Sequence, residues 1–299
     1  MPKTTGMSEN NISAENMDLL KAQLQKLRTM WAAQPTLGER FTVPREGKDG
    51  VQTILYRPVS DEKALPTIFN MHGGAWLGGD AVFMETFCQL LANELPAVVV
   101  NVNYTKADIQ TMPYQQEEIA DAVRYFAAHA DDYGMDADRF VVGGHSAGAH
   151  LACCVAVMMA MEGFHLAAQM LVYPVADLSL KVPGVEELRE LLLPNGGYER
   201  PNVSPALAPI EILEKAAPAL FILCGKDDLL ESGKIYANRL IDAGVAVKVK
   251  QYKKAEHGFL EVNQPDYKTE DFRKSPEQEA YARDCERYLI RELRPLLYF

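Results

Sequence analysis

Apolar side chains recur at helical spacing near the start of the chain and at strand-like spacing after it. Between residues 13 and 31 they follow one another at intervals of four, three and four, at Leu20, Leu24, Leu27 and Trp31. This spacing predicts one amphipathic helix with a single apolar stripe. Prolines and glycines between residues 35 and 50 end the pattern, so we expect a different kind of unit from residue 51 onward.

Strand and helix patterns alternate along the rest of the chain. Short runs rich in β-branched or aromatic residues predict strands at 52–57, 67–71, 98–102, 140–142, 170–173, 220–224 and 245–252. Helical spacing occurs at 84–93, 114–129, 147–162, 231–243 and 275–292. This alternation predicts an α/β fold, in which helices cover both faces of a mostly parallel central sheet. Residues 177–218 are rich in proline and glycine and hold no clear strand, so we expect an insertion lying over the end of the sheet.

Composition is typical of a globular protein and narrows its partners. Of the 299 residues, 48% are apolar and 24% are charged, as in ordinary folded domains. The net charge is −11 and no cluster of Lys and Arg stands out, so nucleic acid is not expected as a partner. The longest apolar run, 151–161, is shorter than the roughly 20 residues of a membrane span. We therefore expect a buried helix there, no membrane partner, and a small molecule as the ligand.

The cysteines and the N-terminal segment predict a cytoplasmic protein. Five cysteines form an odd set without metal-like spacing, at positions 88, 153, 154, 224 and 285, which indicates reduced thiols. Charged residues interrupt the first thirty positions, so no signal peptide is expected. No pair of histidines has the spacing of a helical zinc motif, and we expect neither a metal nor another cofactor.

The strongest chemical signal is the motif Gly144-His145-Ser146-Ala147-Gly148 between a predicted strand and a predicted helix. A serine on such a tight turn projects its hydroxyl beyond the sheet, and the flanking glycines let the two backbones approach without Cβ clashes. We therefore predict Ser146 as a nucleophile. Ala147 begins the helix, so its N–H lacks a partner within the helix and is available to a developing oxyanion.

A second glycine-rich turn follows the strand predicted at 67–71 and reads His72-Gly73-Gly74-Ala75-Trp76. It matches the HGGG-type loop in position and composition, and successive N–H groups of such a turn form an oxyanion hole. We predict Gly74 and Ala75 as further oxyanion donors. His72, Gly73 and Trp76 are expected to support the loop, with His72 as its brace.

A serine hydroxyl near pH 7 needs a base to take its proton. His257 follows the strand predicted at 245–252 and precedes a glycine, and it is our candidate for that base. Other histidines lie on or near helices or directly before the serine, where a structural role is expected: His129, His145, His150 and His165.

A carboxylate must in turn hold the base in the right tautomer. Asp227 follows the strand predicted at 220–224 and is our candidate, with Asp228, Glu231 and Glu256 as alternatives. The carboxyl ends of parallel strands meet at one edge of a sheet. Ser146, Asp227 and His257 are therefore expected to converge.

Together these motifs resemble the hormone-sensitive-lipase-like family of α/β hydrolases, which are small carboxylesterases with an N-terminal cap. The resemblance extends from about residue 65 to 262 and includes Tyr173-Pro174, Ser204-Pro205 and His257-Gly258-Phe259. It implies the α/β-hydrolase fold, a triad of Ser146, Asp227 and His257, and oxyanion donors at Gly74, Ala75 and Ala147. It also implies a helical cap formed by residues 1–45 and by an insertion at about 178–215 within a catalytic domain of residues 46–299.

Two departures from the family pattern keep the substrate class open. The family usually has a third glycine where Ala75 stands and an acidic residue where His145 stands. The HGG-x-W loop together with His145 and His150 also resembles kynurenine formamidases, relatives that cleave a formamide.

We expect a serine carboxylesterase that hydrolyses short-chain, acetyl-like esters through an acyl-enzyme, because Ala75 and Trp76 crowd the acyl side. An arylformamidase is the alternative. A second alternative is a non-catalytic ligand-binding protein, as in the gibberellin receptors, which resemble this family but have lost the base; the presence of His257 argues against it. The resemblance also admits a homodimer.

Overall fold

A computed structural model of the chain describes residues 14–60 and 62–298. These residues divide into two compact units, one ending at Pro35 and one beginning at Thr36. The first unit contains helix α1 (Ala14–Ala32), which confirms the helix predicted at 13–31. The second unit contains the sheet and every candidate site residue.

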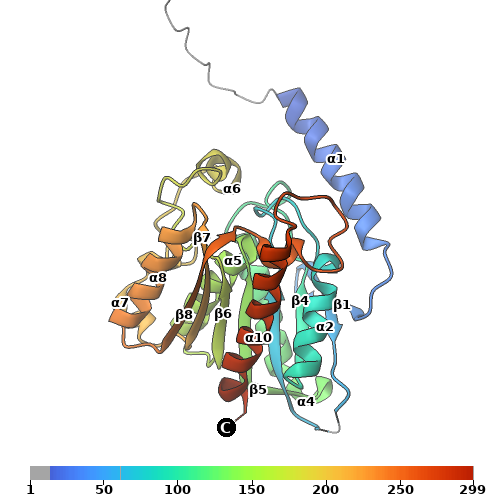
Figure 1. Ribbon diagram of the computed structural model, residues 1–299, viewed down its shortest axis with the longest axis vertical. Coiled ribbons are helices and arrows are strands. Elements are labelled where there is room, and N and C mark those ends of the chain that lie inside the picture. The colour runs from blue at the N-terminus through green and yellow to red at the C-terminus, as the bar shows by residue number, and fades with distance from the viewer. Residues whose placement is uncertain (1–13, 61, 299) are drawn as a thin grey trace, which may run out of the picture. The chain divides into compact units, whose positions relative to one another are not determined.

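An eight-stranded sheet forms the centre of the second unit, in the order β1-β2-β4-β3-β5-β6-β7-β8 (Figure 1). The strands are β1 (Glu39–Arg45), β2 (Lys48–Tyr56), β3 (Leu65–Met71), β4 (Val98–Val102), β5 (Met135–His145), β6 (Ala168–Val172), β7 (Ala219–Lys226) and β8 (Val247–Glu256). β2 is antiparallel to both β1 and β4, whereas all other neighbours are parallel. The predicted mostly parallel sheet is therefore confirmed, and each of the seven predicted strands overlaps an observed one.

Strand β1 is the one strand of the sheet that the sequence pattern did not predict. Pro44 and several charged residues interrupt its alternation, although Val43 is buried. Proline cannot donate to the ladder and is tolerated at a sheet edge, and the register shifts between Val43 and Arg45, around this proline. Residues 39–45 thus belong to the sheet, while the assignment of residues 1–45 to a cap stays a prediction.

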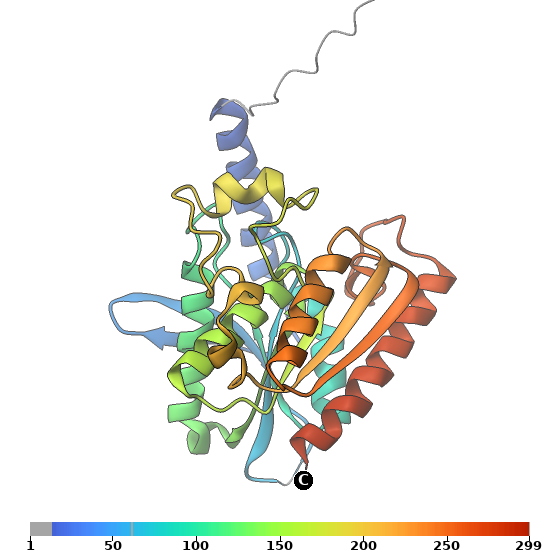
Figure 2. The same cartoon turned by 90° about the vertical axis from the view of Figure 1, so that its left-hand side faces the viewer.

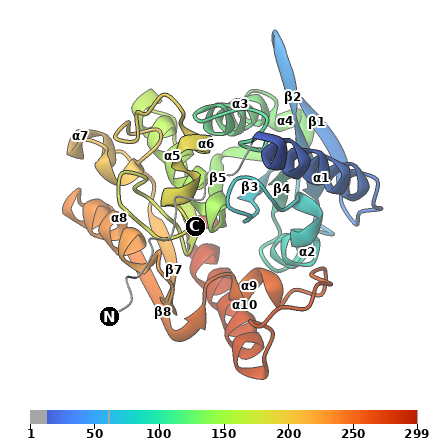
Figure 3. The same ribbon diagram turned by 90° about the horizontal axis from the view of Figure 1, so that it is seen from above.

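Helices cover both faces of the sheet, as predicted. Figure 3 shows α3, α5 and α8 on one side and α2 and α10 on the other. These covering helices are α2 (Glu85–Glu94), α3 (Tyr114–Ala128), α5 (Ala147–Glu162), α8 (Leu230–Asp242) and α10 (Pro276–Leu297). Shorter helices are α4 (Ala130–Tyr133), α6 (Arg189–Leu192), α7 (Ile210–Leu213) and α9 (Phe259–Val262), with 3-10 turns at Ala81–Met84, Glu186–Leu188 and Pro205–Leu207.

The core lies on both sides of the parallel strands and includes nearly all of α5. Every residue of β3, β4 and β6 is buried, as expected for strands covered on both faces. α5 is apolar nearly all round and packs against β5, β6 and α3, which confirms that the apolar run 151–161 is a buried helix.

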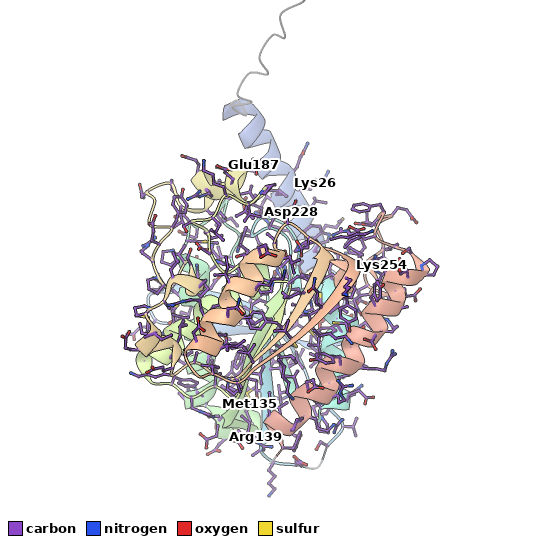
Figure 4. The ribbon with its side chains drawn as sticks, turned by 60° about the vertical axis from the view of Figure 1, so that its left-hand side comes forward. Lys26, Met135, Arg139, Glu187, Asp228 and Lys254 are labelled. Atoms are coloured by element: carbon purple, nitrogen blue, oxygen red, sulfur yellow. The ribbon has the colours of Figure 1, made fainter. Side chains whose placement is uncertain are left out.

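The insertion lies beyond the carboxyl ends of the parallel strands. Figure 4 places Glu187 of the insertion and Asp228, which follows β7, at one end of the sheet. Met135 and Arg139, at the start of β5, lie at the opposite end. Figure 2 shows the yellow helical segment of the insertion, which includes α6, beyond the upper end of the sheet. This edge is where the loops with the candidate site residues meet.

Candidate active site

Ser146 occupies the turn between β5 and α5 in a backbone conformation that side chains rarely adopt. Its φ is +54° and its ψ is −118°. Such a conformation costs on the order of 1–3 kcal/mol and persists only where the surroundings hold it. Here the Ser146 N–H donates to the Val172 carbonyl at 2.9 Å, and the Ser146 carbonyl accepts from the His150 N–H at 2.9 Å. Strain of this kind is typical of a nucleophile held out from a sheet.

The two glycines of the motif are required because three backbone segments meet at this turn. A Cβ on Gly144 would lie 2.6 Å from the Met71 carbonyl oxygen, and a Cβ on Gly148 would lie 2.2 Å from the same atom. Contacts that short do not occur with real Cβ atoms. The end of β3, the turn and the first turn of α5 can therefore approach only where side chains are absent.

The three predicted polar side chains are hydrogen-bonded in series. Ser146 Oγ lies 2.7 Å from His257 Nε2, and His257 Nδ1 lies 2.8 Å from Asp227 Oδ2. The carboxylate can only accept, so Nδ1 carries the proton and Nε2 is left to accept the serine hydroxyl proton. The other carboxylate oxygen, Asp227 Oδ1, accepts from the Leu229 N–H at 2.9 Å.

The alternative acids and bases have other environments, although Asp228 and Glu256 line the same cavity as Ser146. Asp228 is exposed, Glu231 pairs with Lys234, and Glu256 pairs with Lys226. Of the acids considered, Asp227 is the one hydrogen-bonded to His257, and its side chain is 3% exposed. His129, directly after α3, and His165, shortly before β6, are exposed.

His145 and His150 are buried and do not line the cavity beside Ser146. The His145 ring packs edge-on against Phe87 with centroids 5.0 Å apart, and burial lowers the pKa of His145 to about 3. His150 Nδ1 accepts from Trp76 Nε1 at 3.1 Å, while its Nε2 contacts the Val203 carbonyl at 2.7 Å. Burial lowers the pKa of His150 to about 4, so both rings are neutral near pH 7.

The glycine-rich loop after β3 lies against the serine turn. A Cβ on Gly73 would lie 3.5 Å from the Ser146 Cβ. The loop turns sharply, with φ of +130° at Gly74, +51° at Ala75 and +62° at Trp76, and the Gly74 carbonyl accepts from the Gly78 N–H at 2.8 Å. Loop and turn are thus adjacent. The roles of the Gly74, Ala75 and Ala147 N–H groups as oxyanion donors stay predictions.

A cavity of about 590 Å³ opens beside Ser146 and His257. Ala75, Trp76 and Ala147 line it together with the serine. The insertion lines one wall through Pro183, Gly184, Val185 and Leu188, and the loop before α10 contributes Phe272 and Arg273. The insertion therefore borders the space in which a ligand of the serine would lie.

Two charged residues near the site were not predicted from the sequence. The Tyr173 hydroxyl donates to the carboxyl group of Glu261, and burial raises the pKa of Glu261 to about 7. Arg273 Nη1 donates to the His257 carbonyl at 2.9 Å, and the same guanidinium makes an ion pair with Asp271. Glu261 follows the His257 loop closely in the chain, but its partner Tyr173 is 88 positions away, so no local pattern pointed to it.

Neither a metal centre nor a membrane-spanning helix is found in the described chain. Among residues 14–60 and 62–298, no group of three or more His, Cys, Asp or Glu side chains could hold a metal ion. Within the same residues, each helix is too short or too polar to cross a bilayer.

The chain is similar to known proteins in sequence and in fold. The sequence of residues 68–261 matches a protein family that is described as having the alpha/beta hydrolase fold. An ethyl acetate hydrolase of Pseudomonas putida is 31% identical over 226 residues, which cover 69% of this chain and 70% of that protein. A carboxylesterase of Mycobacterium tuberculosis is 26% identical over 275 residues, 83% of each chain. The solved structure of an esterase from Pyrobaculum calidifontis superimposes with a TM-score of 0.76 at 25% identity and covers 95% of each chain.

Proposed function

The chain belongs to the α/β hydrolase fold family, as its resemblance to the hormone-sensitive-lipase-like esterases predicted, and on that premise we propose that it is a serine carboxylic ester hydrolase. The observation that carries the proposal is the hydrogen-bonded series from Ser146 through His257 to Asp227 at the wall of a cavity. The names of the relatives support ester cleavage as the reaction class.

The proposed reaction proceeds through an acyl-enzyme. Ser146 Oγ attacks the ester carbonyl carbon while His257 Nε2 takes the hydroxyl proton, and Asp227 stabilises the resulting imidazolium. The N–H groups of Gly74, Ala75 and Ala147 would bind the oxyanion of the tetrahedral intermediate. Its collapse breaks the ester C–O bond, and His257 returns the proton to the departing alcohol. His257 Nε2 then takes a proton from water, whose oxygen attacks the acyl carbon. The bond from that carbon to Ser146 Oγ breaks, His257 returns the proton to Oγ, and the carboxylic acid leaves.

A short acyl chain is the substrate class that we propose. Ala75 carries a methyl group where the related loops usually have glycine, and the adjacent Trp76 also lines the cavity. The Trp76 side chain is fixed by its hydrogen bond to His150, so it cannot readily move aside for a longer acyl chain. The ethyl acetate hydrolase among the relatives is consistent with this proposal.

Comparing two serine variants tests the proposed nucleophile. Ser146→Ala is expected to lower kcat for p-nitrophenyl acetate by about 10⁴ to 10⁶, as for other serine hydrolases. Ser60→Ala, which removes an exposed hydroxyl, is the matched control and should retain wild-type kcat. A Ser146→Ala protein as active as the control would exclude the proposal.

The arylformamidase alternative rested on the HGG-x-W loop together with His145 and His150; Trp76 of that loop lines the cavity, whereas the two histidines do not. It predicts a higher kcat/KM for formylkynurenine than for acetyl esters, whereas we expect the reverse ratio. The ligand-binding alternative predicts no turnover of either substrate, although His257 is present and contacts Ser146.

A further inference from the structure

Lys106 is a buried cation beneath the glycine-rich loop, in the segment that follows β4. It is 3% exposed, and a lysine so deeply buried is rare unless its charge is fully hydrogen-bonded. Its Nζ lies 2.9 Å from His72 Nε2, 3.0 Å from Asn103 Oδ1 and 2.8 Å from the Tyr104 carbonyl oxygen. These acceptors use all three N–H groups of an ammonium.

The contacts of His72 determine which ring nitrogen carries the proton. His72 Nδ1 lies 2.6 Å from the Gly73 carbonyl oxygen, which can only accept, so Nδ1 must be protonated. His72 Nε2 faces the Lys106 ammonium, which can only donate, so Nε2 must be unprotonated. Burial and the neighbouring Lys106 charge lower the pKa of His72 well below its ordinary value, which keeps the ring neutral.

A second acceptor would stabilise the opposite tautomer if the lysine were absent. Asn103 Oδ1 lies 3.2 Å from His72 Nε2, and the Asn103 amide is oriented by its Nδ2, which donates to Asp80 Oδ2 at 2.8 Å. With no ammonium between them, Nε2–H could donate to this oxygen. Nδ1 would then lose its proton and its hydrogen bond to Gly73.

We propose that Lys106 is a positioning residue that selects the Nδ1–H tautomer of His72 and thereby orients the peptide between Gly73 and Gly74. In a trans peptide, the carbonyl of one residue and the N–H of the next point in opposite directions. The bond from His72 holds the Gly73 carbonyl and so fixes the direction of the Gly74 N–H. Since Gly74 is a predicted oxyanion donor, the catalytic consequence rests on the proposed function, whereas the tautomer itself does not.

The residues around Lys106 hold its ammonium group in a fixed position. Tyr104 lies beneath the ammonium, with Nζ 4.2 Å from the ring centroid, and stacks on the His72 ring at 4.5 Å. The Tyr104 hydroxyl donates to the His72 carbonyl at 3.0 Å. Asp80, itself 3% exposed, accepts a hydrogen bond from the Asn103 amide, whose oxygen in turn accepts from Lys106, so a carboxylate lies one residue away from the ammonium. An apolar side chain of similar length would fill the same space without the desolvation cost of an ion, so volume alone does not explain the lysine.

The first test observes the tautomer directly. Long-range ¹H–¹⁵N correlation spectra of ¹⁵N-histidine-labelled protein distinguish Nδ1–H from Nε2–H, and a His72→Asn spectrum assigns the His72 signals. We expect the Nδ1–H form in the wild type and the Nε2–H form in Lys106→Met. A wild-type His72 that is Nε2-protonated or doubly protonated at pH 7 would overturn the inference, whether or not the protein hydrolyses esters and whether or not the variant folds.

The second test measures the consequence for catalysis. Loss of one oxyanion donor costs about 10² to 10³ in kcat, so a misdirected Gly74 N–H in Lys106→Met should lower kcat by about 10-fold to 100-fold while KM stays within about threefold. The exposed Lys215→Met is the matched control, with kcat within about twofold of wild type.

A double-mutant cycle separates positioning from a general structural role. The side-chain amide of Asn at position 72 can donate to the Gly73 carbonyl without help from Lys106. In the His72→Asn background, Lys106→Met should therefore change kcat by less than about threefold. An equal loss in both backgrounds would contradict the proposed route through His72.

Discussion

Replacing Gly148 with alanine gives opposite expectations from local propensity and from the packing of the turn. Gly148 lies in the first turn of α5, and Gly→Ala within a helix normally stabilises a protein by about 1 kcal/mol. In this fold, however, the new Cβ would lie 2.2 Å from the Met71 carbonyl oxygen and 2.5 Å from the His72 carbonyl oxygen. Both are backbone atoms, which cannot rotate away as a side chain could.

The size of the effect follows from these distances. Comfortable contacts begin at 3.4 Å, so the helix start and the end of β3 must separate by about 1 Å. Overpacking of this kind costs about 1–3 kcal/mol, and a displacement of 1 Å at a catalytic group costs about 100-fold in rate. We therefore expect Gly148→Ala to lower both the free energy of unfolding and kcat.

The assay combines urea unfolding with hydrolysis of p-nitrophenyl acetate, and Gly163→Ala serves as the control. Gly163 caps the other end of α5 with φ of +71° and has open space where a Cβ would be. Its replacement should cost about 1–2 kcal/mol in stability through backbone strain while kcat stays within about twofold. A Gly148→Ala protein that is more stable than wild type and keeps its kcat would refute the packing argument.

Three further outcomes are expected. Burial raises the pKa of Glu261 from 4.5 to about 7, so the protonated carboxyl group stabilises the fold at low pH and this stabilisation is lost as the pH rises from 4.5 through 7. In urea titrations, the free energy of unfolding of the wild type should fall by about 3 kcal/mol relative to that of Glu261→Gln between pH 4 and pH 8. Equal pH dependence of the two proteins would contradict this. Arg273→Met removes the guanidinium that donates to the His257 carbonyl and so holds the backbone of the base in place. We therefore expect kcat to fall about tenfold with little change in KM. A change confined to KM would instead assign Arg273 to substrate binding. Cys153 and Cys154 are fully buried in α5, and burial raises the pKa of both thiols. A thiol reagent should therefore label them only as fast as the protein unfolds. Rapid labelling of the folded protein would instead show that α5 opens without global unfolding.

The turn motifs could be predicted because each couples a chemical group to a local backbone requirement. Gly144 and Gly148 flank Ser146 at positions where the structure leaves no room for a Cβ, and this requirement is visible within five consecutive letters. The parallel sheet then brings Asp227 and His257 to the same edge, which follows from strand order without knowledge of any side-chain contact.

Residues that act through distant partners could not be predicted in this way. Glu261 contacts Tyr173 from 88 positions away, and Lys106 reaches back 34 positions to His72. From the sequence alone, each of these side chains would be predicted as an ordinary surface charge. Only the folded structure shows that it is largely buried. Strand β1 was missed for a different reason, since Pro44 normally ends a strand but is accommodated at a sheet edge with a register shift.

Site-resolved labelling with a fluorophosphonate tests the central claim most directly. Such a probe reacts with a serine only when a neighbouring base activates its hydroxyl, and Ser146 lies 2.7 Å from His257 Nε2. Mass spectrometry of peptides from the labelled protein should find one phosphonate adduct, on Ser146, and none in Ser146→Ala. Stoichiometric labelling of another residue, or no labelling of the folded wild-type protein, would contradict the account.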